Sequence, residues 1–132
     1  MPVNVYTSDN DRIVHMDYVD PWTLSDYLAS VAVQQAVCNK LTGPVTLIVD
    51  LRGTSHVPPG IIRARESPLL RDKHLSTIIA VGGPVAAQFL GEAVLRLARY
   101  NKAHFVKTLE QAMDLIHAAE PVPSTGSGVP IA

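Results

Sequence analysis

Two nearly continuous apolar runs dominate the pattern of hydrophobic and polar positions along the chain. They are Val45-Thr46-Leu47-Ile48-Val49-Asp50-Leu51 and Leu75-Ser76-Thr77-Ile78-Ile79-Ala80-Val81. Both runs are rich in β-branched residues, which is typical of parallel strands that are covered on both faces. We therefore predict two buried parallel strands, Pro44–Leu51 and Leu75–Val81, at the centre of the fold.

The segments around these runs alternate between strand and helix patterns. Short strands are predicted over Val3–Tyr6, Arg12–Tyr18 and Ala103–Val106, and the turn-forming residues 8–11 join the first two. In the second strand Ile13, His15 and Asp17 alternate with Val14, Met16 and Tyr18, which indicates one packed face and one face in water. Helices are predicted over Pro21–Leu41, Gly60–Leu70, Pro84–Tyr100 and Thr108–Ala119. Two of them begin with capping pairs, Thr23 with Asp26 and Thr108 with Gln111.

The resulting element order, ββαβαβαβα, predicts an α/β fold. We expect a mixed, mostly parallel sheet of about five strands with four helices, right-handed crossovers and an antiparallel hairpin at one edge. Residues 1–120 are predicted to form one domain. Residues 121–132 contain three prolines, two glycines and three hydroxyl residues, so we expect a disordered tail there.

Composition and charge exclude several classes of protein. The net charge of −1 argues against a nucleic-acid-binding protein, which usually carries a basic excess. No stretch approaches the roughly 20 apolar residues that span a bilayer, and the N-terminus does not resemble a signal peptide. The single cysteine, Cys38, cannot form an internal disulfide or a zinc site, and we expect it to be buried and inert. We therefore expect a cytoplasmic protein.

The most informative candidate for a functional site is the segment from Asp50 to Gly60. It follows the carboxyl end of a central strand, where open α/β sheets place their functional loops. We predict a binding site formed by this loop, the next helix and the turn after the second buried strand. Its residues are Asp50, Arg52, Thr54, Ser55, His56, Pro58, Pro59, Arg63, Gly82 and Gly83. The alternative for the loop is a rigid strand-to-helix connection in which Asp50 caps backbone amides.

No catalytic or cofactor motif stands out. Asp50, Ser55 and His56 do not form a triad pattern, because adjacent residues rarely point at one another and the nucleophile elbow is absent. Gly82-Gly83-Pro84 lacks the phosphate-loop pattern and indicates a tight turn. We predict no enzyme activity, no cofactor and no metal. The histidines show no ligand spacing; they are His15, His56, His74, His104 and His117.

Basic residues cluster on and after the predicted second helix. They are Arg63, Arg65, Arg71, Lys73 and His74, with Glu66 and Asp72 between them. The cluster is either a solvated helix face or a docking surface for an acidic partner.

In element order the chain resembles the STAS family, the domain shared by sulphate transporters and anti-sigma-factor antagonists. The likeness covers about residues 3–119 and is greatest to STAS-like bacterial proteins of unassigned function. It rests on the strand Val45–Leu51 ending in Asp50-Leu51, on the strand Ile78–Val81, and on the closing segment Phe105–Ala112. The resemblance implies a protein-interaction domain in bacterial signalling.

In signalling members of the family, a serine at the start of the helix after Asp-Leu is phosphorylated, and the added charge breaks the complex. Here Pro59-Gly60 occupies that place, so the resemblance does not extend to the phosphorylation switch.

Our leading hypothesis is therefore a non-catalytic domain that docks a regulatory protein through the region Arg52–Arg65. A small-molecule or lipid-binding domain is the alternative, and a homodimer through an exposed first strand stays open.

Overall fold

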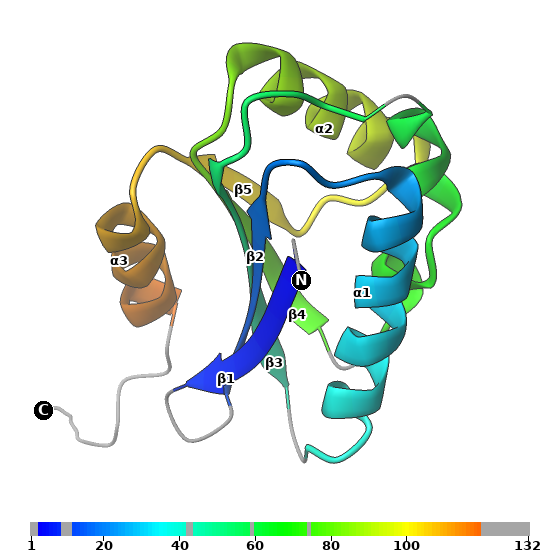
Figure 1. Ribbon diagram of the computed structural model, residues 1–132. Coiled ribbons are helices and arrows are strands. Elements are labelled where there is room, and N and C mark those ends of the chain that lie inside the picture. The colour runs from blue at the N-terminus through cyan, green and yellow to red at the C-terminus, as the bar shows by residue number, and fades with distance from the viewer. Residues whose placement is uncertain (1–2, 9–11, 42–43, 59, 74, 120–132) are drawn as a thin grey trace, which may run out of the picture.

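The computed structural model describes residues 3–8, 12–41, 44–58, 60–73 and 75–119. The predicted site residue Pro59, the basic residue His74, the side chain of Arg65 and the predicted tail at 121–132 lie outside this part. Over the described residues the chain forms an α/β fold with one five-stranded sheet (Figure 1). The elements are β1 (Val3–Ser8), β2 (Ile13–Val19), α1 (Leu24–Cys38), β3 (Val45–Gly53), η1 (Ile61–Glu66), η2 (Pro68–Arg71), β4 (Leu75–Val81), α2 (Val85–Leu97), β5 (Ala103–Val106) and α3 (Leu109–Ala119).

The strands lie side by side in the same order as in the sequence, β1-β2-β3-β4-β5. β1 pairs antiparallel with β2, and every later pair is parallel. The predicted mixed, mostly parallel sheet is thus confirmed, with the two apolar runs as its neighbouring strands β3 and β4. This arrangement brings the carboxyl ends of β2, β3, β4 and β5 to one edge.

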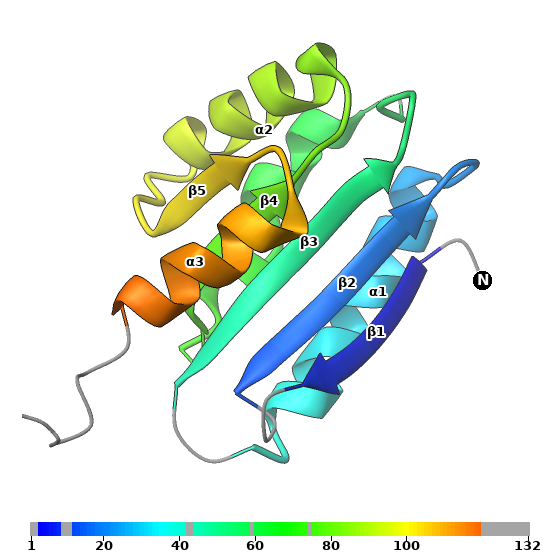
Figure 2. The ribbon, with the colours of Figure 1, turned by 90° about the vertical axis from the view of Figure 1, so that its left-hand side faces the viewer.

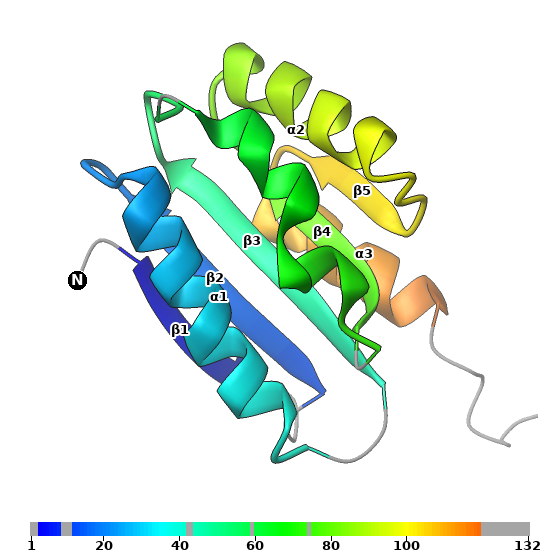
Figure 3. The same ribbon diagram turned by 90° about the vertical axis from the view of Figure 1, so that its right-hand side faces the viewer.

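The helices divide between the two faces of the sheet. α1, η1, η2 and α2 lie on one face (Figure 3), and α3 packs alone on the other, against β3, β4 and β5. A core cluster lies on each side of the sheet, one around Met16 and Leu47 and the other around Ile48 and Ile79. Because α3 covers only part of its face, β1 and β2 have no helix in front of them on that side (Figure 2).

Both predicted capping pairs are present. Thr23 Oγ1 accepts from Asp26 N at 3.1 Å while Asp26 accepts from Thr23 N at 2.8 Å. Thr108 Oγ1 accepts from Gln111 N at 3.1 Å, and the Gln111 side chain accepts from Thr108 N at 3.3 Å. The first cap fixes the start of α1 at Leu24, so the prediction of a helix from Pro21 was wrong by three residues.

The predicted second helix, Gly60–Leu70, is wrong in kind. The segment forms two 3₁₀ helices, η1 and η2, separated by Ser67 in an extended conformation (φ −64°, ψ 138°). Pro68 explains the break, because a proline disfavours the helical conformation in the residue before it. Ser67 then begins η2, since its side chain accepts from Leu69 N at 3.2 Å.

The third predicted helix, α2, presents apolar side chains to solvent. Val85, Phe89 and Leu97 follow one another at four- and eight-residue spacing, and their exposed fractions are 85%, 72% and 60%. The helix packs against η1 through its other side, where Val94 is buried. An apolar stripe of this kind on a surface helix is a feature of interaction surfaces.

Candidate functional site

Eight of the ten predicted site residues fall into three groups. Asp50 and Arg52 lie on β3 itself, because this strand continues two residues beyond its predicted end, to Gly53. The extension is held by pairing of Gly53 with Val19 of β2 and by a hydrogen bond from Asp20 N to Gly53 O at 3.0 Å. Thr54, Ser55, His56 and Pro58 form the loop that follows. Gly82 and Gly83 form the turn between β4 and α2.

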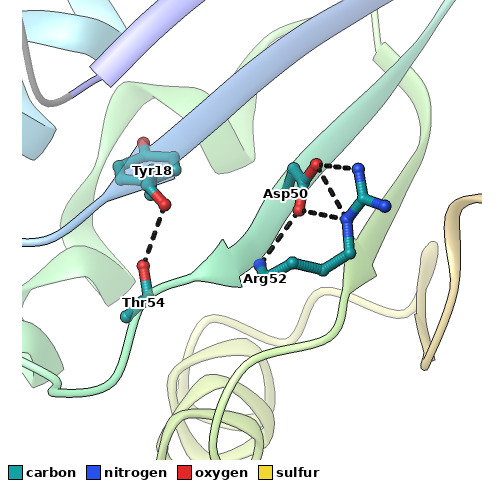
Figure 4. A network of polar contacts seen from close by, with 4 residues as sticks. All are labelled: Tyr18, Asp50, Arg52 and Thr54. Atoms are coloured by element: carbon teal, nitrogen blue, oxygen red, sulfur yellow. Dashed lines mark hydrogen bonds and ion pairs between the residues drawn. The ribbon is translucent and has the colours of Figure 1, made fainter.

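Thr54 anchors the loop to β2 and to the start of α1. Its buried hydroxyl donates to the backbone carbonyl of Tyr18 at 3.1 Å (Figure 4) and accepts from Trp22 Nε1 at 3.0 Å. Thr54 N donates to Leu51 O at 3.0 Å. This side chain therefore ties the loop to the end of β2 and to the residues before α1, more than 30 positions away in the sequence, and it fixes the direction in which the loop leaves the sheet.

Asp20 holds the next residue of the loop. Its Oδ2 accepts from Ser55 N at 2.7 Å and also from the Ser55 hydroxyl, which in turn lies 2.9 Å from His56 Nδ1. The two hydrogen bonds from Ser55 keep the pKa of Asp20 below its usual value. In this chain of contacts the hydroxyl lies between the carboxylate and the imidazole. A catalytic triad needs the imidazole in the middle, so these residues do not form one.

An open hollow of about 860 Å³ lies beside the loop, at this end of the sheet. It is lined by Trp22, Leu24, Val57 and Pro58, and Asp20, Ser55 and His56 supply polar groups. Pro58 is buried, whereas Ser55 and His56 are exposed. The loop thus presents two polar side chains on an apolar and rigid base.

Asp50 and Arg52 form a bidentate ion pair on the other side of the strand end (Figure 4). Arg52 Nη2 lies 2.6 Å from Asp50 Oδ2, and Arg52 Nε lies 3.0 Å from Asp50 Oδ1. Partial burial acts to raise the pKa of Asp50, but hydrogen bonds from the Arg52 side chain and backbone outweigh it and lower that pKa. Asp50 also accepts from Arg52 N at 3.0 Å, so the capping of a backbone amide by Asp50 is confirmed.

The turn formed by Gly82 and Gly83 passes close to Arg52 and Leu51 of β3. Gly82 has φ +67°, and a Cβ built on it would lie 2.6 Å from Arg52 Cγ. Gly83 has φ +88°, and its Cβ would lie 3.0 Å from Leu51 Cβ. Both positions require glycine because the backbone is left-handed and β3 lies close by. The turn therefore has a packing role, as the sequence indicated.

Arg63 lies on η1 with an exposed side chain. Gly60 precedes η1 with φ 80°, and it lies between Leu24 and the stem of Arg63. The STAS resemblance would place a serine near Pro59 or Gly60; Pro59 lies outside the described residues, and Gly60 is a left-handed glycine.

The sequence prediction missed three polar residues on the open face of the sheet, namely Tyr6, His15 and Asp17. The rings of Tyr6 and His15 stack with centroids 4.5 Å apart and planes 3° apart. Asp17 is in register with Asp50 on the neighbouring strand. The alternation of Ile13, His15 and Asp17 in β2 was the available signal, but it did not tell which residues of β1 and β3 would share their face.

His15 is paired with a hydroxyl on β1. Its Nε2 lies 2.7 Å from Ser8 Oγ. Burial lowers the pKa of His15, and the charges of Asp17 and Asp50 act in the opposite direction. Within the described residues no carboxylate accepts a hydrogen bond from the other ring nitrogen, so the pair lacks the third group that orients a catalytic base.

The other candidates behave as buried or surface residues. Cys38 is fully buried, and burial raises the pKa of its thiol. The described residues contain no group of three or more histidine, cysteine, aspartate or glutamate side chains that could hold a metal ion. In the same part of the chain, no helix is long and apolar enough to cross a membrane.

No protein-family model, no curated protein and no solved structure matches this chain.

Proposed function

We propose that the chain is a non-catalytic, STAS-like protein-interaction domain of bacterial signalling or regulation, and that a regulatory protein docks on the loop after β3. The observation that supports this most is the way the loop is held. Thr54 and Pro58 are buried and fix its path, while Arg52, His56 and Arg63 are exposed along it. A loop that is ordered before binding loses little conformational entropy when a partner covers it.

The elements around the loop have two further features that are common in interfaces, exposed apolar side chains and arginines. η1, which follows the loop, packs against α2, whose Val85 and Phe89 are exposed. Interfaces commonly combine an apolar centre with a polar rim, and arginine is enriched in them. Arg52 and Arg63 favour a partner with acidic groups. In this proposal Gly60 cannot be phosphorylated, so binding is not controlled in the manner of the signalling STAS proteins.

The experiment uses two triple variants of the full chain as baits. The first, Arg52→Ala with His56→Ala and Arg63→Ala, removes two cations and one imidazole from the loop region. The second, Lys102→Ala with His104→Ala and Lys107→Ala, removes the same groups from exposed positions around β5. We expect the first variant to lose a partner that the parent and the second variant both capture. Retention of every partner by the first variant would refute the surface assignment.

A small-molecule or lipid-binding domain is the second candidate, and the hollow beside the loop favours it. Ligand sites in open α/β sheets lie beyond the carboxyl ends of the strands, and they combine apolar walls with a few polar groups. The hollow has this position and this lining. Trp22 is the only tryptophan in the chain and lines the hollow, so its fluorescence reports on occupancy. A ligand should raise the melting temperature and change this emission together, with about 2.7 kcal/mol of stabilisation at 100 times its Kd. Stabilisation without any change at Trp22 would place the ligand elsewhere.

A two-fold homodimer through β1 is a separate proposal about partners. β1 lies at the edge of the sheet, and an edge strand can pair with the same strand of a second copy. Sedimentation equilibrium of the full chain at several concentrations tests it. A mass that rises towards twice 14.2 kDa supports the dimer, and a constant monomer mass contradicts it.

The setting that we propose is the cytoplasm, without nucleic acid as a partner. The single cysteine is buried and unpaired by disulfide, which fits a reducing compartment. The net charge of −1 gives no basic excess for a phosphate backbone.

A further inference from the structure

A second polar site lies on the face of the sheet that α3 leaves uncovered. β1 and β2 are open on this side (Figure 2). Five side chains from three adjacent strands gather here, and the proposed docking loop uses only Arg52 among them. They are Tyr6 of β1, His15 and Asp17 of β2, and Asp50 and Arg52 of β3.

The two carboxylates of this site differ in how far their charge and their hydrogen-bond acceptors are matched by donors. Asp17 and Asp50 are register partners on parallel strands, so their side chains project from the same face next to each other. Asp50 is neutralised by its bidentate pair with Arg52. Asp17 Oδ1 is buried and has no hydrogen-bond partner among the residues that the structure describes. Two carboxylates and one guanidinium leave a charge of −1 at the site, and a buried acceptor without a donor is costly.

The stacked rings of Tyr6 and His15 lie beside these carboxylates. Tyr6 stacks on His15, and the residue as a whole remains 46% exposed. Partial burial and the neighbouring Asp17 carboxylate raise the pKa of the Tyr6 hydroxyl. A flat ring next to a carboxylate is a common setting for a guanidinium group, which can stack on the ring while it donates to the oxygens.

A small hollow lies next to Asp17 and gives room for such a group. It measures about 330 Å³ and is lined by Asp17, Asp50 and Arg52, together with Tyr18, Val19 and Gly53. A guanidinium group with its adjoining methylenes is smaller than this volume, so the hollow has room for it.

We propose that the hollow beside Asp17 and Asp50 binds a guanidinium group, in which one N–H donates to Asp17 Oδ1. The group completes the hydrogen bonding of the buried oxygen and balances the remaining negative charge. Its source is either a small guanidine compound or an arginine side chain of another protein. This inference does not rest on the docking loop, because four of its five residues lie outside the proposed docking surface.

The test is an NMR titration of the full ¹⁵N-labelled chain with three probes. They are agmatine, the capped tripeptide acetyl-Gly-Arg-Gly-amide, and the same tripeptide with citrulline in place of arginine. Citrulline has nearly the same shape but a neutral urea group. We expect saturable shifts of the amides of residues 15–19 and 50–53 with a guanidinium probe, and binding at least about tenfold weaker with citrulline, because a charged hydrogen bond is lost. Shifts with both agmatine and the arginine peptide indicate a site for small guanidines, and shifts with the peptide alone indicate an arginine of a protein partner.

Two variants complete the experiment. Asp17→Asn should weaken binding of the guanidinium probe at least about tenfold, whereas Asp114→Asn removes the same charge from an exposed position on α3 and should change nothing. The comparison of arginine with citrulline on the parent chain does not depend on the folding of either variant. Equal binding of citrulline, no saturable shift with any guanidinium probe, or unchanged affinity in a folded Asp17→Asn chain would overturn the proposal.

Discussion

Replacing Thr54 with valine tests whether the loop after β3 is held as described. Valine has nearly the same shape as threonine, so the substitution removes the hydroxyl and leaves the packing. The carbonyl of Tyr18 then loses a donor, and Trp22 Nε1 loses its acceptor. The only intended change is therefore the loss of two hydrogen bonds at a position that is 6% exposed.

The expected loss of stability follows from these two groups. Leaving a buried polar group without a partner costs about 1–3 kcal/mol. Trp22 is only half-buried and can reach water, which places the total near the lower end, at about 2 kcal/mol. For a domain of this size each kcal/mol lowers the melting temperature by roughly 4 °C, so we expect a decrease of about 8 °C.

Urea and thermal unfolding, both followed by Trp22 emission, measure this effect. Thr54→Ser is the matched control, because it keeps the hydroxyl and removes one methyl group, at a cost of at most about 1 kcal/mol. The valine variant should therefore be the less stable of the two. If valine equals the parent while serine is the destabilised variant, Thr54 acts through packing, and the reasoning about a hydrogen-bonded loop is refuted.

Three further substitutions test other parts of the structure. Burial lowers the pKa of His15, so the unfolded chain binds a proton more readily than the folded one, and stability should fall as the pH drops from the ordinary pKa of about 6.5 to the lowered pKa. His15→Gln should flatten this part of a stability–pH curve, and an unchanged slope would contradict the prediction. Gly82→Ala should cost about 1–2 kcal/mol in urea unfolding, because alanine is strained at φ +67° and its Cβ meets Arg52; an unchanged midpoint would show that the turn relaxes. Tyr18→Phe should cost only about 1 kcal/mol by the same assay, since Ser30 keeps its hydrogen bond to a backbone carbonyl at 2.6 Å; a loss above about 3 kcal/mol would contradict this.

Local patterns were sufficient to predict the sheet and most of its connections. The apolar runs of β3 and β4 are long and β-branched, and the capping pairs at Thr23 and Thr108 lie where the helices begin. These features act between residues close in sequence, so one sequence carries enough information for them. The helix predicted over 60–70 is interrupted at Ser67, because Pro68 disfavours the helical conformation in the residue before it.

The candidate sites were harder to predict, because they are made by pairing between strands. Asp50 was identified from its place near the end of an apolar run. Its ion pair with Arg52 was not predicted, because the strand was expected to end at Leu51 and continues to Gly53. Asp17 meets Asp50, and Tyr6 meets His15, only because of the sheet register. Asp20 and Trp22 hold the loop from more than 30 residues away. Such contacts form between residues that are distant in sequence, so the periodic patterns of a single sequence do not predict them.

The central proposal is that a regulatory protein covers the loop after β3. Hydrogen–deuterium exchange of the full chain, alone and in complex with a partner that the triple loop variant fails to capture, tests it most directly. We predict slower exchange at residues 53–58 and at the start of α2, and unchanged exchange in α3. Slower exchange in α3 and β5, with none in the loop, would contradict the proposal.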